Sequence, residues 1–417
     1  MDLLLKNVRV ADDRSLVDIG VEGTTIAAIE PQVQSEAART IDVGGRVALP
    51  GLLEPHLHLD KALLYERRPA RDGTLEEAIR ITGQLKASQD REDVLERSRR
   101  VLDMAVRAGT VAVRAHPDVD PIQGLLGVET ALQLGEEYAG LLDLQVVAFP
   151  QEGIVKAPGT LELMQDALRA GATVVGGCPY NERTWEDTKR HVDAVFDLAQ
   201  RFDVPVDMHA DFSDDVSDAR YFAAGYIAER TIALGYRGRV SLGHMTSLAS
   251  LEPDEAKVVV DQLRDAGIHI VTLPATDLYL GGRKDAANQR RGLTPVHRLR
   301  DAGVNVTFSS NNVRNAFTPF GKADPLLIAN LLAHVAQFGT PHSQAEVLEM
   351  ATHSAARAMG IADTYGLVPG RQADLVVLDT TRVSDVLLDV PPRTWVLKRG
   401  RVTVETRHEC LVHRPTE

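Results

Sequence analysis

The sequence predicts an α/β protein with a (β/α)8 barrel and a small composite β-sandwich domain. At 417 residues the chain is long enough for one large domain and a smaller one. Both ends alternate apolar and polar residues over short stretches, which is typical of antiparallel strands. The middle repeats a short apolar strand followed by a long amphipathic segment. We expect residues 1–48 and 367–417 to form the β-domain and residues 49–366 the barrel.

Each end of the chain supplies only part of a sheet. The strand candidates are residues 3–10, 18–22 and 25–29 at one end, and 374–378 and 394–404 at the other. The last of these contains the turn Arg399-Gly400. Because so few strands do not make a stable sheet alone, we expect the two ends to pair with each other.

The middle of the chain contains eight candidates for barrel strands. Apolar runs without alternation are typical of parallel strands that are buried on both faces. Amphipathic segments such as residues 161–170 and 186–202 are expected to be helices that cover them. The expected strands are residues 47–50, 111–114, 144–149, 173–175, 204–208, 240–242, 268–272 and 304–308.

Composition narrows the class of partner. The formal net charge of -13 argues against nucleic acids and anionic membranes as partners. No apolar run approaches the length needed to span a bilayer, and no signal peptide is visible, so we expect a cytoplasmic protein. Cys178 and Cys410 are the two cysteines, which is too few for a disulfide framework or a cysteine zinc site.

Polar side chains stand where the predicted barrel strands end, and barrel enzymes carry their active sites at that face. In an extended chain residues i and i+2 point to the same side, so His56 and His58 are expected to face the barrel mouth together. Neutral imidazole is a preferred ligand of zinc, iron, nickel and copper. A single histidine is more often structural, but several at strand ends favour a metal site: His56, His58, His116, His209 and His244.

Several motifs together resemble the amidohydrolase superfamily. The resemblance is to its bacterial cytosine deaminase branch, including the N-isopropylammelide amidohydrolase-like enzymes that remove N-alkyl groups from s-triazine rings. It covers nearly the whole chain. The motifs are Glu54-Pro-His-Leu-His-Leu-Asp60, Phe149-Pro-Gln-Glu-Gly-Ile154, Asp207-Met-His-Ala-Asp211, Gly243-His-Met-Thr246, Arg290-Arg-Gly-Leu293, Pro319-Phe-Gly321 and residues 366–378.

The resemblance implies one divalent metal ion, zinc or iron, with His56, His58 and His209 as ligands and Asn311 beside them. It makes His244 a catalytic histidine and Gln151 the residue that hydrogen-bonds a ring amide of the substrate. The alternative for Gln151 is a buried glutamine that caps the next helix. Because this branch uses one metal, Lys61 is not assigned as a bridging ligand. A symmetric homo-oligomer is also expected.

Two positions depart from the family pattern. Relatives carry at Asn311 an aspartate that contacts the metal and accepts a proton, and asparagine cannot accept one at neutral pH. Cytosine deaminases carry at Phe212 a glutamate that protonates the pyrimidine ring. We expect Phe212 and Asn312 to contact the substrate instead.

The missing proton acceptor needs a replacement. Asp211 lies two residues beyond His209, so an extended backbone would aim it at the same mouth, and we expect it to serve as the base. The alternative is that the acidic run 211–218 is a solvated loop with helix-capping residues, which we favour for Asp214, Asp215 and Asp218. Asp277 also follows a strand end.

The expected function is hydrolysis of a carbon–nitrogen bond in a small cyclic amidine, ureide or N-substituted heterocycle. Two alternatives keep the same barrel. One is a non-hydrolytic reaction by a lyase, isomerase or cyclase, for which the two lost carboxylates would be the reason. The other is a binding protein without catalysis, which the retained histidines disfavour.

Overall fold

A computed structural model describes residues 1–213, 217–407, 409 and 411–413. Its largest sheet has eight strands in sequential order, each hydrogen-bonded in parallel to the next. The sheet closes where Leu57 bridges Asn311: the His58 N–H donates to the Asn311 carbonyl (2.9 Å), and the Asn311 N–H donates to the His56 carbonyl (3.1 Å). The strands are β6 (Leu52–Leu57), β7 (Thr110–Ala115), β8 (Asp143–Ala148), β9 (Val174–Gly177), β10 (Val206–Ala210), β11 (Val240–His244), β12 (His269–Thr272) and β13 (Asn305–Phe308).

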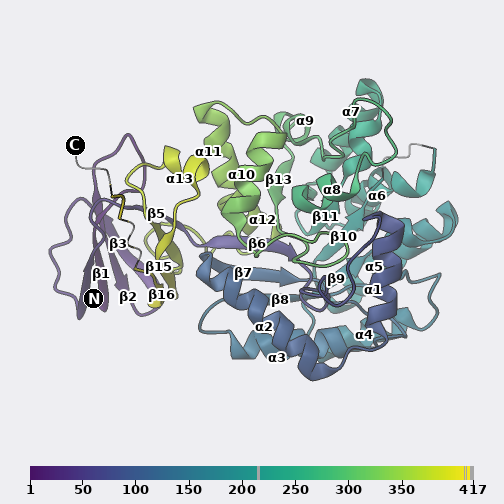
Figure 1. Cartoon of the computed structure of the whole chain (residues 1–417), viewed down its shortest axis with the longest axis horizontal. Coiled ribbons are helices and arrows are strands. Elements are labelled where there is room, and N and C mark those ends of the chain that lie inside the picture. The colour runs from purple at the N-terminus through teal and green to yellow at the C-terminus, as the bar shows by residue number, and fades with distance from the viewer. Residues whose placement is uncertain (214–216, 408, 410, 414–417) are drawn as a thin grey trace.

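Helices surround this barrel on its outside (Figure 1). Five of them begin at residues that the sequence makes good caps, whose side chains accept hydrogen bonds from the first turns of α1, α2, α5, α10 and α11: Thr74, Asp90, Thr184, Asp324 and Thr340. The barrel helices are α1 (Leu75–Lys86), α2 (Arg91–Arg107), α3 (Leu126–Glu137), α4 (Thr160–Ala170), α5 (Trp185–Phe202), α6 (Ala224–Ala233), α7 (Pro253–Asp265), α8 (Pro274–Leu280), α9 (Val296–Asp301), α10 (Pro325–Val335), α11 (Pro341–Glu349) and α12 (Ala355–Ala358).

The small domain lies at one end of the barrel and is built from strands near both ends of the chain (Figure 1). One sheet has the order β3-β2-β1-β4 and the other β16-β15-β14-β5, and buried side chains of both sheets form one apolar cluster. Arg399 and Gly400 have φ values of 48° and 76° in the β15–β16 turn, as a tight hairpin requires. The elements are β1 (Leu3–Val8), β2 (Val17–Glu22), β3 (Thr25–Glu30), β4 (Arg39–Asp42), β5 (Val47–Pro50), β14 (Leu375–Leu378), α13 (Ser384–Asp389), β15 (Arg393–Lys398) and β16 (Arg401–Glu405).

The predicted fold class is confirmed, but the first predicted barrel strand is wrong. Residues 47–50 form β5, which pairs antiparallel with β14 of the small domain, and the first barrel strand is β6. The chain passes from the small-domain sheet to the barrel sheet at Pro50-Gly51. A Cβ on Gly51 would lie 2.3 Å from the Val111 side chain, so only glycine can lie this close to β7. Strand β5 also spans the predicted domain boundary between residues 48 and 49. The division of the chain into two domains at that boundary stays a prediction.

No helix in the described part of the chain combines the length and apolar character that crossing a membrane requires.

Candidate active site

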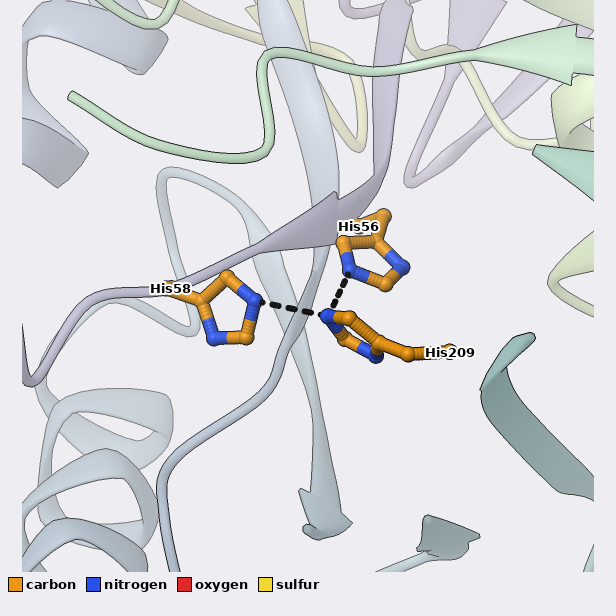
Figure 2. A group of neighbouring side chains, drawn as sticks. All are labelled: His56, His58 and His209. Atoms are coloured by element: carbon orange, nitrogen blue, oxygen red, sulfur yellow. Dashed lines mark hydrogen bonds between the residues drawn. The ribbon is translucent and has the colours of Figure 1, made fainter. Parts of the chain in front are cut away.

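Three histidines bring their Nε2 atoms together at the barrel mouth. His209 Nε2 lies 3.1 Å from His56 Nε2 and 3.1 Å from His58 Nε2 (Figure 2). His56 lies on β6, His58 follows its end, and His209 lies on β10. Nitrogens that each lie about 2.0–2.1 Å from one zinc ion are about 2.9–3.4 Å apart at ligand angles between 90° and tetrahedral. The spacing therefore fits three ligands of a single metal ion.

The surroundings of these rings favour the form that binds metal. His58 Nδ1 lies 2.9 Å from the His116 carbonyl, which can only accept, so His58 carries its proton on Nδ1 and keeps a lone pair on Nε2. Burial lowers the pKa of His56, His58 and His209 well below the usual range. Nearby positive charges lower it further: those of other histidines for all three rings, and that of Lys61 for His58 and His209. At neutral pH all three are uncharged.

A second cluster supports the far edge of the His56 ring. Asp207 Oδ1 lies 3.7 Å from His56 Nδ1 and 3.1 Å from His116 Nε2, while Asp207 Oδ2 accepts a hydrogen bond from Arg114 Nη1 (2.8 Å). The rings of His56 and His116 are stacked with centroids 3.8 Å apart. Lone pairs of stacked rings lie in nearly parallel planes and do not converge on one ion. The cluster therefore packs against His56, and its stacked rings suit a metal ion less well than the three converging histidines.

Asn311 offers an oxygen beside the three histidines. Its side chain is buried and lines the cavity, and its Oδ1 has no hydrogen-bond partner among the residues that the structure describes. A buried acceptor without a partner is unfavourable, so this atom fits the role of a further metal ligand. The segment before it is held by Glu54, which accepts hydrogen bonds from the Ser310 N–H (2.8 Å) and the Ser310 hydroxyl (2.5 Å). Burial raises the pKa of Glu54 to about 7.

His244 and Asp277 form a buried dyad beside the metal-site histidines, with the His244 and His209 ring centroids 5.1 Å apart. His244 Nδ1 lies 2.7 Å from Asp277 Oδ1, and the two side chains are 4% and 0% exposed. Burial raises the pKa of Asp277, and the nearby His244 opposes that shift. An ionised Asp277 can only accept, so it holds the His244 proton on Nδ1 and leaves Nε2 as a proton acceptor. His244 lines the cavity that the metal-site histidines face.

Apolar and amide side chains complete the cavity. The Phe212 ring lies against the His244 ring with centroids 4.4 Å apart. Gln151 and Asn312 lie in the wall, as the sequence predicted, and Lys61 joins them. The lining residues are His58, Lys61, Leu75, Ile79, Gln151, Tyr180, Asn181, His209, Phe212, His244, Thr276, Leu280, Asn311, Asn312 and Phe317.

The structure does not bring Asp211 to this cavity. Its carboxylate accepts hydrogen bonds from the N–H groups of Ala223 (2.8 Å) and Ala224 (3.1 Å) at the start of α6. Strand β10 ends at Ala210, and Asp211 has φ of 50°, so the rule that residues i and i+2 share a side stops applying there. The described geometry is that of a helix-capping residue. Asp214 and Asp215 lie outside the described residues, whereas Asp218 accepts a hydrogen bond from the Arg220 N–H (3.0 Å) at the start of a short 3₁₀ turn, as a capping residue does.

Three polar residues of this site were given no role in the prediction from the sequence. Asp277 was noted only as following a strand, and its contact with His244 joins the ends of β11 and β12. Asp207 precedes His209 by two residues and gave no separate signal. Lys61 was set aside because a bridging role did not apply.

Comparisons with known proteins agree with the resemblance found in the sequence. Residues 39–404 match the amidohydrolase family. N-isopropylammelide isopropyl amidohydrolase from Pseudomonas sp. (strain ADP) is 28% identical and covers 97% of this chain and 97% of its own. The structure of 5-methylcytosine deaminase from Klebsiella pneumoniae with phosphonocytosine has a TM-score of 0.92 at 33% identity, over 99% of this chain and 100% of that one. N-isopropylammelide isopropylaminohydrolase from Burkholderia multivorans has a TM-score of 0.85 at 31% identity, over 96% and 98%.

Proposed function

Because the chain belongs to the amidohydrolase family, we propose that it hydrolyses a carbon–nitrogen bond in a small nitrogen heterocycle: a cyclic amidine, a ureide or an N-substituted ring. The observation that carries this proposal is the arrangement of two kinds of histidine around one cavity. Three neutral imidazoles converge on a point that fits a metal ion, and a fourth is paired with a buried aspartate. This combination is suited to attack by water on a ring carbon.

The residues present fit one divalent metal ion, zinc or iron. His56, His58, His209 and Asn311 would hold it. When bound, such an ion acts as a Lewis acid and lowers the pKa of water towards neutrality. Asn311 contributes an amide oxygen and no proton acceptor, so proton transfer has to depend on another group.

His244 takes that role in our proposal. Its Nε2 accepts a proton from the attacking water and delivers it to the nitrogen that leaves. Asp277 keeps the Nδ1 proton in place and stabilises the imidazolium while the proton is held. Phe212 covers one face of His244 and limits the access of bulk water. Proton transfer has thus moved from the end of β13, where relatives carry aspartate, to the ends of β11 and β12.

The substrate ring would lie against Phe212, with Gln151 and Asn312 as hydrogen-bonding partners. The names of the relatives, N-isopropylammelide amidohydrolase and 5-methylcytosine deaminase, support a six-membered nitrogen ring. The absence of the ring-protonating glutamate at Phe212 argues against cytosine itself. Assembly into a symmetric homo-oligomer and a cytoplasmic location remain predictions from the sequence.

The test is turnover in ¹⁸O-labelled water. Zinc-loaded and iron-loaded protein would be incubated with amino- and alkylamino-substituted pyrimidines and triazines, N-isopropylammelide and 5-methylcytosine among them. We expect release of ammonia or an amine, and a ring product that carries one solvent oxygen. The matched control is the His244→Gln variant with equal metal content. A product without solvent oxygen would favour a lyase or isomerase, and no product from any ring would refute the hydrolase.

A further inference from the structure

A buried carboxylate behind the cavity wall holds the loop that carries Gln151. This loop follows β8, and three of its consecutive backbone N–H groups donate to the carboxylate of Glu182: those of Ile154 (2.7 Å), Val155 (3.0 Å) and Lys156 (2.8 Å). Successive N–H groups that point to one side form an anion-binding concavity, and here the anion belongs to the chain itself. Glu182 does not line the cavity, and the proposed reaction gives it no role.

The loop can close around this carboxylate because residue 153 is glycine. Gly153 has φ of 89°, a backbone conformation that favours glycine. A Cβ at this position would lie 2.8 Å from Glu182 Oε1. Any side chain at residue 153 would therefore strain the backbone and push the carboxylate away from the loop.

His191 pairs with Glu182, and its own neighbours fix its proton. His191 Nδ1 lies 2.7 Å from Glu182 Oε1, and His191 Nε2 lies 3.0 Å from the backbone nitrogen of Cys178. Because a backbone N–H can only donate, Nε2 has to accept, so the proton is on Nδ1 and faces Glu182. Burial lowers the pKa of His191 against the opposing effect of Glu182, whereas the hydrogen bonds to Glu182 overcome its burial and lower the pKa of that carboxyl. At neutral pH the pair is an ionised carboxylate and a neutral imidazole.

The pair joins three segments of the barrel. Glu182 binds the loop after β8, His191 lies on α5, and Cys178 directly follows β9. The side chains of Glu182 and His191 are both 0% exposed, so bulk water cannot take over their hydrogen bonds. Loss of either side chain would leave buried groups of the other segments without partners, which is unfavourable.

The joined segments carry three residues of the cavity wall. Gln151 comes from the loop after β8, and Tyr180 and Asn181 come from the short 3₁₀ turn that precedes Glu182. Asn181 links the two segments directly, since its Nδ2 donates to the Gln151 carbonyl (2.6 Å) and its Oδ1 accepts from Lys156 Nζ (2.9 Å). A shift of the loop or of the turn would therefore move all three wall residues together.

From these contacts we infer that Glu182 and His191 are positioning residues, which hold the loop after β8 and the turn after β9 where a bound substrate meets them. Neither side chain lines the cavity, so the pair acts through the wall residues of the two segments. Because these segments form a wall and do not carry the proton-transfer dyad, the pair sets the affinity for substrate and leaves the chemical step unchanged. This inference rests on the proposed function, because it concerns the substrate wall of the same site.

Hydrogen exchange tests the hold on the loop without any substrate. In Glu182→Gln the NH₂ group of the new side chain meets a backbone N–H, so the zinc-loaded variant should exchange the loop amides of residues 154–156 about tenfold faster or more than wild type. His191→Leu should act in the same direction, because Glu182 loses its buried partner. His191→Gln is the conservative variant: its amide can donate to Glu182 and accept from Cys178, so it should keep the loop protected.

Steady-state kinetics separate a positioning role from a merely structural one. With the ring substrate identified in labelled water, Glu182→Gln and His191→Leu should raise KM about tenfold or more, with kcat and zinc content within about threefold of wild type. His191→Gln should keep a KM near that of wild type. The matched control is Asp18→Asn, because Asp18 is a buried carboxylate of the small domain that also accepts from backbone N–H groups, those of Asn7 (3.1 Å) and Val33 (3.2 Å). This control should change neither KM nor the exchange of the loop.

Unchanged exchange of the loop in both Glu182→Gln and His191→Leu would overturn the inference. Faster exchange with an unchanged KM would overturn it too, because the pair would then stabilise the loop without placing the wall. An equal rise of KM in Asp18→Asn would assign the effect to a general loss of stability. Should Glu182→Gln not fold, His191→Leu compared with His191→Gln makes the same test. A wild type that hydrolyses no ring would refute the proposed function, and the exchange measurement would then decide the inference by itself, since it needs no substrate.

Discussion

Replacing Asp277 with asparagine tests the proton-transfer dyad with little change in shape. In the wild type the Asp277 carboxylate accepts the Nδ1 proton of His244 across 2.7 Å, in surroundings that are almost fully buried. An asparagine can place its NH₂ group at this position and donate to Nδ1. That contact favours the tautomer with the proton on Nε2, which is the atom that has to accept a proton.

The magnitude follows from what a general base contributes, about a hundredfold to ten-thousandfold in rate. We therefore expect Asp277→Asn to lower kcat by that factor, or to raise the barrier by about 3–5 kcal/mol. KM should change little, because Asp277 does not line the cavity. The assay is steady-state kinetics on the ring substrate identified with labelled water, with zinc content measured on the same samples.

Asp211→Asn is the control variant for this experiment. Asp211 is the base expected from the sequence, yet its carboxylate accepts backbone hydrogen bonds at the start of α6. An asparagine oxygen can still accept one of them, so we expect a loss of stability of about 1 kcal/mol and a kcat within tenfold of wild type. A large loss of kcat in Asp211→Asn, with an unaffected Asp277→Asn, would refute the assignment of the dyad.

Three further outcomes are expected. Asn311→Asp should lower the Kd for zinc about tenfold or more in a chelator competition, since an anionic oxygen replaces a neutral one; an unchanged Kd would remove Asn311 from the ligand set. Removal of metal by a chelator should lower the midpoint of thermal unfolding, and zinc at about 100 times its Kd should restore about 2.7 kcal/mol; equal midpoints would contradict the metal site. The pKa of His269 is lowered from 6.5 to about 4 mainly by burial, with the Gly238 carbonyl opposing. Between pH 6.5 and 4 the unfolded chain therefore binds more protons than the folded one, so the free energy of unfolding should fall by up to about 3 kcal/mol as the pH drops. The fall should be less steep in His269→Gln. An equal fall in both proteins, measured by urea unfolding at each pH, would contradict this.

The shared direction of His56 and His58 could be predicted from the sequence because it is a local property of a strand. Residues i and i+2 of a strand share a side, so His56 and His58 face the same mouth whatever surrounds them. The same rule wrongly predicted that Asp211 faces the mouth, because its backbone has already left the strand, with φ of 50°. The prediction that residues 47–50 form the first barrel strand was wrong for a different reason. Their apolar pattern suits a strand of either domain, and the pairing with β14, more than 300 residues away, decides between the two.

The amide orientations could not be predicted at all. Which atom of Gln151 faces the cavity depends on Lys61, and which atom of Asn312 does so depends on Asn315 and the backbone beyond it. A sequence shows that an amide is present, but its donor and acceptor sides are set by neighbours that the fold brings into contact.

The amino-acid sequence by itself determined the barrel class and the presence of β-strands at both ends of the chain, because periodicity is a property of short stretches. Its resemblance to the family also predicted three histidine ligands, which the structure brings together. It also showed that the family's aspartate and glutamate are replaced by Asn311 and Phe212. Only the tertiary structure decided which other polar groups meet at this site. Asp277 reaches His244, and Lys61 reaches Gln151, through hydrogen bonds between segments that are 33 and 90 residues apart. Such contacts form when the barrel closes, so they depend on the whole fold.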